Sequence, residues 1–268
     1  MTAQGEATLA PVVAGVDRAT CAAGVEYAAT EARRTGRPLD LVHVAPVGNG
    51  WLALIGQDAL RLARSRAVVQ AGERVPVRTV LQRGDVVEEL ARSAAAAALV
   101  IVEQLPPHQQ RRRSRAVAAE LAARVDAPMV AVPADWVARS GSIVTVGFDP
   151  LAPDDVALAA AVREARLRRA TLRVVVSGAR GDLDDRLDGL GADACELAVE
   201  GATGDPVAAL RRAARTSSLL VVGRHAPTPP RPSRLGAVSW SVLQDPPCPV
   251  LLTPPGHVHH LGGSAGAA

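Results

Sequence analysis

The sequence predicts an α/β protein made of two tandem copies of one doubly wound domain, each with a five-stranded parallel sheet and helices on both faces. Three observations predict this fold. Short apolar runs bounded by turn residues alternate with longer segments of helical spacing, which is typical of parallel strands and their connecting helices. The same order of motifs occurs twice in the 268 residues. Apolar residues make up 48% of the chain and aromatic residues 2%, so we expect aliphatic cores.

The first domain is expected to span residues 11–133. Its five apolar runs are predicted to be strands, at residues 12–16, 39–44, 75–81, 99–102 and 128–132. Helical patterns fall between them, at residues 20–36, 51–71, 84–94 and 114–125. Thr20 is a suitable N-cap and Gly36 a suitable C-terminal stop for the first helix.

The second domain is expected to span residues 143–254 and repeats the first. Gly147-Phe148-Asp149 corresponds to Gly15-Val16-Asp17, and Gly204-Asp205 corresponds to Gly84-Asp85. Strands are predicted at residues 143–146, 172–176, 219–222 and 249–252, with helices from Asp154 or Asp155, from 204–207 and over 236–244. The offset between equivalent motifs falls from 132 to 120 residues, so the second copy lacks about a dozen residues after its second strand. A short helix near 182–188 is therefore expected in place of the helix at 51–71.

Composition and patterning argue against several classes of protein. A formal net charge of +3 is too small an excess to indicate nucleic-acid binding, and no apolar run approaches the ~18 residues of a membrane span. Cys21, Cys195 and Cys248 show no metal-ligand spacing, so reduced thiols in a cytoplasmic protein and no metal site are expected. Residues 1–10 do not have the pattern of a signal peptide. These residues and 256–268 are expected to be disordered.

The stretch from Leu219 to Pro254 carries the clearest candidate site. It is predicted to form a strand, a Pro-rich loop, a helix that begins near Gly236 and a second parallel strand. The loop ends at a helix N-terminus, where backbone N–H groups without an intrahelical partner can bind an anion.

Several motifs together resemble the universal stress protein family. They are Gly15-Val16-Asp17, Leu41-Val42-His43-Val44, Gly84-Asp85, Val221-Val222-Gly223 and Cys248-Pro249-Val250, and their order fits nearly the whole chain twice. The resemblance implies strand order 3-2-1-4-5 in each half and a pseudo-dimer in which the halves pair through their last strands. It also implies ATP or another adenine nucleotide as the ligand, at the carboxyl ends of the strands, where the switch-point rule also places ligands.

The second half keeps part of the glycine motif that cradles ribose and phosphates in the nucleotide-binding branch of that family. Gly223 and Gly236 stand at the first and third glycine positions, whereas Ala226 replaces the second glycine and Ala237 the hydroxyl. Prolines at 227, 229, 230 and 232 remove backbone donors from the loop. The nucleotide-binding candidates are Asp149, Val176, Ser177, Gly223, Gly236, Ala237, Val238 and Ser239. Two interpretations stay open, a weakened adenine-nucleotide site or glycines that let a helix pack closely on the sheet.

The first half has lost the motif. Glu103 stands at the first glycine position, and a carboxylate repels phosphate, so no nucleotide is expected there although Asp17 remains. The arginines at 111, 112, 113 and 115 are expected to form a solvated basic loop, the alternative being a site for a phosphate or an acidic partner. His43 lies in an apolar strand and is expected to be a hydrogen-bonded core histidine.

Three functions compete at this level. The first is a non-catalytic stress-response protein that works by binding a protein partner or a second copy. The second is an adenine-nucleotide-binding protein that uses its second half, with slow hydrolysis. The third is an enzyme such as an ATP-dependent ligase, but the segments after Asp17 and Asp149 lack the Gly/Ser-rich pyrophosphate loop of that class. Because no spacing indicates catalytic residues, we do not expect an enzyme.

Overall fold

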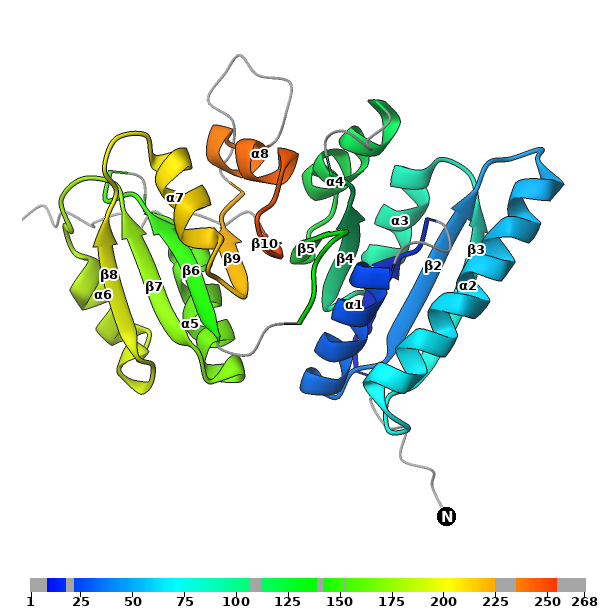
Figure 1. The fold of residues 1–268 in the computed structure, drawn as a ribbon, viewed down its shortest axis with the longest axis horizontal. Coiled ribbons are helices and arrows are strands. Elements are labelled where there is room, and N and C mark those ends of the chain that lie inside the picture. The colour runs from blue at the N-terminus through cyan, green and yellow to red at the C-terminus, as the bar shows by residue number, and fades with distance from the viewer. Residues whose placement is uncertain are drawn as a thin grey trace, which may run out of the picture.

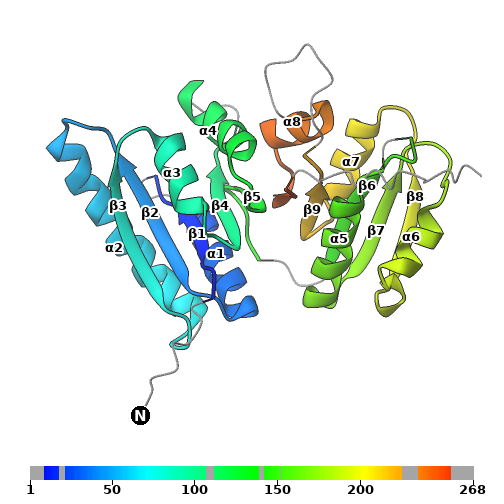
Figure 2. The ribbon, with the colours of Figure 1, turned by 180° about the vertical axis from the view of Figure 1, so that it is seen from behind.

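The computed structural model describes residues 9–17, 22–106, 112–138, 142–151, 153–224 and 235–254, with the side chains of 112–116 left out. Two α/β halves lie side by side (Figures 1 and 2). The first half contains β1 (Val12–Gly15), α1 (Ala22–Thr35), β2 (Leu39–Ala45), α2 (Gly50–Ala71), β3 (Val77–Arg83), α3 (Val86–Ala94), β4 (Leu99–Gln104), α4 (Arg112–Arg124) and β5 (Met129–Pro133). The second half contains β6 (Ile143–Phe148), α5 (Asp155–Arg168), β7 (Thr171–Val176), α6 (Leu183–Gly189), a 3-10 turn (Ala192–Ala194), β8 (Leu197–Gly201), α7 (Pro206–Ala214), β9 (Leu219–Val222), α8 (Ala237–Gln244) and β10 (Val250–Leu252).

The strand order is β3-β2-β1-β4-β5 in the first half and β8-β7-β6-β9-β10 in the second, so both halves have the expected order 3-2-1-4-5. Neighbouring strands within each half are parallel. One core packs α1, α2, α5 and α6 on one face of the sheet, and a second core packs α3, α4, α7 and α8 on the other. The doubly wound prediction is therefore confirmed.

The two halves form one sheet, whereas the sequence predicted two. β5 and β10 pair antiparallel, with Val250 opposite Ala131 and Leu252 opposite Met129, which makes a mixed ten-stranded sheet. The expected contact through the last strands is confirmed, and its form follows from edge chemistry. Two unpaired edge strands related by a pseudo-twofold axis satisfy their backbone groups by pairing with each other.

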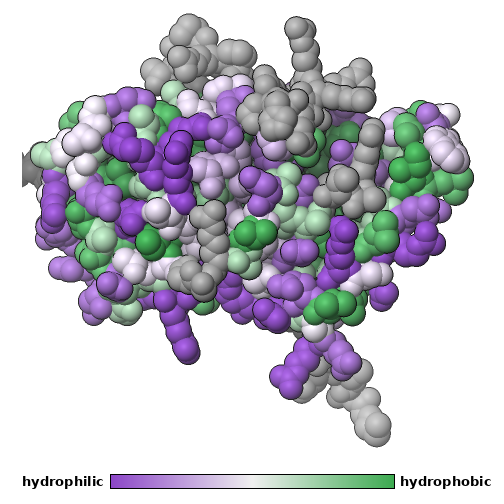
Figure 3. Space-filling model, in the orientation of Figure 1, coloured by the Kyte–Doolittle hydropathy of each residue, from purple (hydrophilic) through white to green (hydrophobic). Residues whose placement is uncertain are grey.

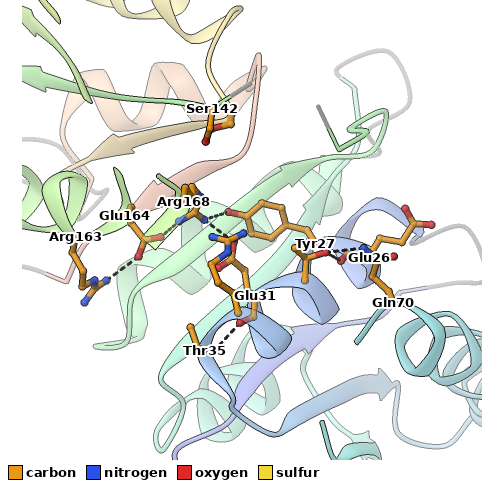
Figure 4. Close-up of polar contacts among 12 residues, drawn as sticks. Glu26, Tyr27, Glu31, Thr35, Gln70, Ser142, Arg163, Glu164 and Arg168 are labelled. Atoms are coloured by element: carbon orange, nitrogen blue, oxygen red, sulfur yellow. Dashed lines mark hydrogen bonds and ion pairs between the residues drawn. The ribbon is translucent and has the colours of Figure 1, made fainter. Parts of the chain in front are cut away.

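A buried ionic network joins the halves beside this pair of strands (Figure 4). Arg168 at the end of α5 donates to Glu164, to Glu31 on α1 at 2.6 Å and to the Tyr27 hydroxyl at 3.1 Å. Burial raises the pKa of Glu31, and the Arg168 and Arg34 guanidinium groups oppose that shift. Because charges buried this deeply need their partners, the network ties α5 to α1.

Acidic N-caps explain the starts of three helices. The side chains of Asp85, Asp154 and Asp205 each accept hydrogen bonds from the first turn of α3, α5 and α7, as N-caps do. The predicted short helix of the second half is α6, and the long helix predicted at 51–71 is α2. α4 begins at Arg112, two residues before the predicted start.

Several predictions concern residues outside the described ranges. They are the Thr20 cap, Cys21, Arg111, the loop containing Ala226 and the prolines, and, except for residues 9 and 10, the two terminal segments expected to be disordered. His43 lies in the described part and is buried, with Nδ1 2.7 Å from the carbonyl oxygen of Val16. The prediction of a hydrogen-bonded core histidine is confirmed.

Candidate functional site

A small cavity lies at the carboxyl ends of β6, β7 and β9, on the side of the sheet covered by α7 and α8. Its volume is about 150 Å³. Its lining consists of Gly147, Phe148, Asp149, Asp154, Val175, Ser177, Ala202, Pro206, Leu210, Val222, Gly223, Val238 and Ser239. The cavity therefore occupies the switch point between β6 and β9, where open α/β sheets bind ligands.

The structure brings together five of the eight predicted site residues in this lining: Asp149, Ser177, Gly223, Val238 and Ser239. The other three lie outside it. Val176 is buried in the core, and its carbonyl oxygen accepts from the Ala202 N–H at 2.7 Å. Gly236 and Ala237 belong to the start of α8, beside the cavity.

Ser239 does not offer its hydroxyl to a ligand. Its Oγ is buried and donates a 2.6 Å hydrogen bond to the carbonyl oxygen of Gly223. The bond joins the first turn of α8 to the end of β9. Ser239 therefore fixes the geometry of the site and does not replace the hydroxyl lost at Ala237.

Asp154 fills the space that the glycine at 223 leaves open. A Cβ atom on Gly223 would lie 1.6 Å from Asp154 Oδ2, so any side chain there would overlap the carboxylate. Asp154 Oδ1 accepts from the Ala157 N–H at 2.9 Å and caps α5. The sequence pattern predicts that Asp154 starts a helix but does not place it in the site. The sequence feature that could have indicated this position is the presence of both an acidic N-cap after β6 and a glycine directly after β9.

The electrostatics of the cavity are mixed. The described lining residues include two carboxylates, Asp149 and Asp154, and no basic side chain. Asp149 is exposed, and its Oδ1 accepts from the Leu151 N–H at 3.0 Å. The N-terminus of α8 opposes these negative charges. Its first N–H groups have no intrahelical partner, and Gly236 provides no side chain to cap them. The site thus has polar groups for a base or sugar but repels phosphate on the Asp154 side.

Arg224, which follows Gly223, points away from the cavity. Its guanidinium group donates to the carbonyl oxygens of Val125, of Ala122 at 2.8 Å and of Ala127 at 2.6 Å, at the carboxyl end of α4 in the other half. Burial lowers the pKa of Arg224 to about 10. The arginine that directly follows the glycine position is therefore used to cap a helix across the joint.

The equivalent position in the first half holds a carboxylate as predicted, and the structure shows what that carboxylate binds. Glu103 Oε2 accepts from the Gly24 N–H at 2.9 Å, in the first turn of α1. A Cβ on Gly24 would lie 3.1 Å from the Cβ of Glu103, so the small residue at 24 permits this approach. Burial raises the pKa of Glu103 to about 7, although hydrogen bonds from the Gly24 and Ala23 N–H groups lower it.

No group of three or more potential metal ligands occurs among the described residues. Within the same residues, none of the helices is both long enough and apolar enough to cross a membrane.

Comparisons with known proteins agree with this architecture. The sequence profile of the Universal stress protein family matches residues 177–254. A universal stress protein from Archaeoglobus fulgidus DSM 4304 has a similar structure, with a TM-score of 0.73 and 15% identity over 91% of this chain and 97% of that chain. A putative universal stress protein from Pseudomonas aeruginosa UCBPP-PA14 gives a TM-score of 0.58 and 17% identity over 91% of this chain and 93% of that chain. A protein of unknown function from Pseudomonas aeruginosa PAO1 gives a TM-score of 0.57 and 18% identity over 91% of this chain and 92% of that chain.

A comparison with curated proteins found no match. The structural likeness covers both halves and establishes the fold, and the profile match covers the segment that contains Ser177, the glycine positions and β10. Residues 177–254 of the second half therefore resemble the universal stress protein family, and the two halves together share the fold of the solved universal stress protein from Archaeoglobus fulgidus DSM 4304.

Proposed function

We propose that this protein is a cytoplasmic stress-response protein that acts by binding and not by catalysis, with its nucleotide site lost in the first half and weakened in the second. One observation carries the proposal. In each half a carboxyl group occupies the space at the first glycine position of the family motif. In the first half Glu103 replaces the glycine, and in the second half the Asp154 side chain lies against Gly223.

The first half supports the loss of binding most directly. The Glu103 carboxylate already accepts a hydrogen bond from the Gly24 N–H in the first turn of α1. An anionic ligand would have to displace this carboxylate from a partly buried position and then face Asp17, which also lies close enough to raise the pKa of Glu103. Both steps disfavour an anion.

The second half supports weak binding without selectivity for phosphates. A cavity of about 150 Å³ is small beside the roughly 300–1,000 Å³ of most ligand pockets. Asp149 and Ser177 remain near the place of the base and ribose in the family's nucleotide-binding branch, while Asp154 stands where phosphate charge has to be matched. The base and ribose should therefore contribute more than the phosphates.

Adenine-nucleotide binding by the second half, with slow hydrolysis, is the alternative function. It is favoured by the uncapped N-terminus of α8, whose dipole attracts an anion by roughly 0.3–1 kcal/mol. Calorimetric titration of the full chain with ATP, ADP and AMP separates the two proposals. Similar weak affinities for all three support a weakened site, and tight binding of ATP with weak binding of AMP supports the alternative.

A further inference from the structure

Helix α2 has its large apolar side chains on the outside. The residues that it buries are mostly small, namely Ala53, Gly56, Ala59, Leu60, Ala63, Ala67 and Ala71. Its exposed face carries Trp51 at 70%, Leu54 at 56%, Leu62 at 48% and Val69 at 86% exposed. A surface helix ordinarily places such residues toward the core, so this arrangement marks an interaction surface. In Figure 3 green apolar residues lie over this helix on the right of the molecule.

The outer residues follow a regular spacing. Steps of four and three residues alternate along one side of the helix, through Trp51, Ile55, Asp58, Leu62, Ser65 and Val69. This is the heptad spacing of a seam that packs against another helix, with Ile55, Leu62 and Val69 each seven residues apart. Near its middle the exposed Asp58 pairs with Arg61 at 2.6 Å. The spacing predicts a helical partner, and the central carboxylate disfavours burial in lipid.

The edges of strands β5 and β10 are not available to a second copy. β5 and β10 pair inside the molecule, which leaves β3 and β8 at the ends of the sheet. α2 packs on β2 and β3, at the outer end of the first half (Figure 1). The corresponding helix of the second half, α6, has seven residues against the 22 of α2. The surface is therefore a feature of the first half alone.

We propose that two copies of this chain associate through antiparallel α2 helices, related by a twofold axis near residue 60. In this register Trp51 of each copy meets Val69 of the other, Ile55 meets Ser65 and Asp58 meets Leu62. Arg61, which precedes Leu62, then flanks Asp58 of the other copy. Each Asp58 carboxylate then has the Arg61 of its own chain and the Arg61 of the other copy nearby, so a second copy offers this seam a complementary charge.

Sedimentation velocity over a concentration series tests the proposal on the full chain. The unmodified chain should show a monomer–dimer equilibrium, and Leu62→Glu should weaken association by at least about tenfold. Leu167→Glu is the matched control, because Leu167 on α5 is 46% exposed, close to the 48% of Leu62. A chain that remains monomeric overturns the proposal, and so does a dimer that Leu62→Glu leaves intact.

A charge exchange identifies the partner as a second copy. Asp58→Arg and Arg61→Asp should each weaken self-association, because each places like charges at the centre of the seam. An equimolar mixture should associate again, since arginines at 58 and 61 of one chain then face aspartates at both positions of the other. Failure of the mixture to associate overturns the antiparallel α2 pairing. Unchanged melting temperatures establish that the variants remain folded.

Discussion

Glu103 and Asp154 place a carboxylate on the same amide of equivalent helices. Glu103 Oε2 accepts from the N–H of Gly24, the third residue of α1, and Asp154 Oδ1 accepts from that of Ala157, the third residue of α5, both at 2.9 Å. The carboxylate comes from the strand end in one half and from the helix cap in the other. In each case the facing position is a glycine, Gly24 or Gly223. The two halves thus satisfy the equivalent helix N-terminus with a carboxyl group that comes from different positions in the chain.

Glu103→Gln should change how stability depends on pH. The folded pKa of Glu103 is about 7, against 4.5 as its ordinary value, so between these pH values the folded protein holds a proton that the unfolded chain has released. The stability gained from this group is fully present below pH 4.5 and is lost as the pH rises through 7. Glutamine can still accept from Gly24 and does not ionise. The variant should therefore gain on the order of 1–3 kcal/mol relative to the unmodified chain between pH 5 and pH 8.

Urea denaturation of both proteins at pH 5 and pH 8 measures this difference. Other titrating groups contribute equally to both chains and cancel in the comparison. A stability difference that is the same at both pH values contradicts the assignment of a protonated Glu103.

Gly223→Ala should destabilise the second half because the new methyl group overlaps the Asp154 carboxylate. The expected loss is about 1–3 kcal/mol, as for other overpacked sites. Asp154→Ser keeps an N-cap oxygen for α5 and shortens the side chain. In that background Gly223→Ala should cost less than about 1 kcal/mol. Chemical denaturation of the four chains of this double-mutant cycle gives the coupling, and additive effects would show that the two residues do not compete for space.

Arg168→Met should loosen the joint between the halves. It leaves Glu31 and Glu164 without their shared cation in a buried position, at an expected loss of about 3–5 kcal/mol of stability. Arg163→Met is the matched control, because Arg163 is 60% exposed and contacts the same Glu164 at 3.2 Å. The control should lose no more than about 1 kcal/mol. Equal losses from the two variants in thermal denaturation would exclude a special role for Arg168.

Asp154→Ser should also restore selectivity for phosphates. Removing this carboxylate takes a negative charge away from Gly223 and the α8 N-terminus, so ATP should gain about tenfold or more in affinity relative to AMP. Adding Ala237→Ser, which returns the missing hydroxyl, should increase the gain. A titration in which AMP gains as much as ATP would mean that Asp154 acts through the shape of the cavity and not through its charge.

Much of the fold can be predicted from the sequence because the patterns that determine its helices and strands are local. Apolar runs, Asp85 and Asp205 at helix starts and the repeated Gly-x-Asp motifs predict the elements, their order and the shortened helix of the second half. The pairing of β5 with β10 into one sheet depends on the contact between halves, which no local pattern encodes. Arg224 shows the same limit, since its partners at the end of α4 are about a hundred residues away in the chain.

The site is predictable in part for the same reason. Asp149, Ser177 and Gly223 follow strand ends, and strand ends of a parallel sheet converge. Side-chain direction decides the rest. The Ser239 hydroxyl donates to the Gly223 carbonyl oxygen, and the Val176 carbonyl oxygen accepts from the Ala202 N–H. The Asp154 carboxylate lies against Gly223. None of these orientations follows from the spacing of residues in the sequence.

The most direct test of the central claim is isothermal titration calorimetry of the full chain with ATP and with AMP under the same conditions. If carboxylates occupy the phosphate positions of both halves, the two nucleotides bind weakly, with at most one equivalent per chain and affinities within about tenfold of each other. Tight binding of ATP together with poor binding of AMP, or two equivalents of ATP per chain, would contradict the account.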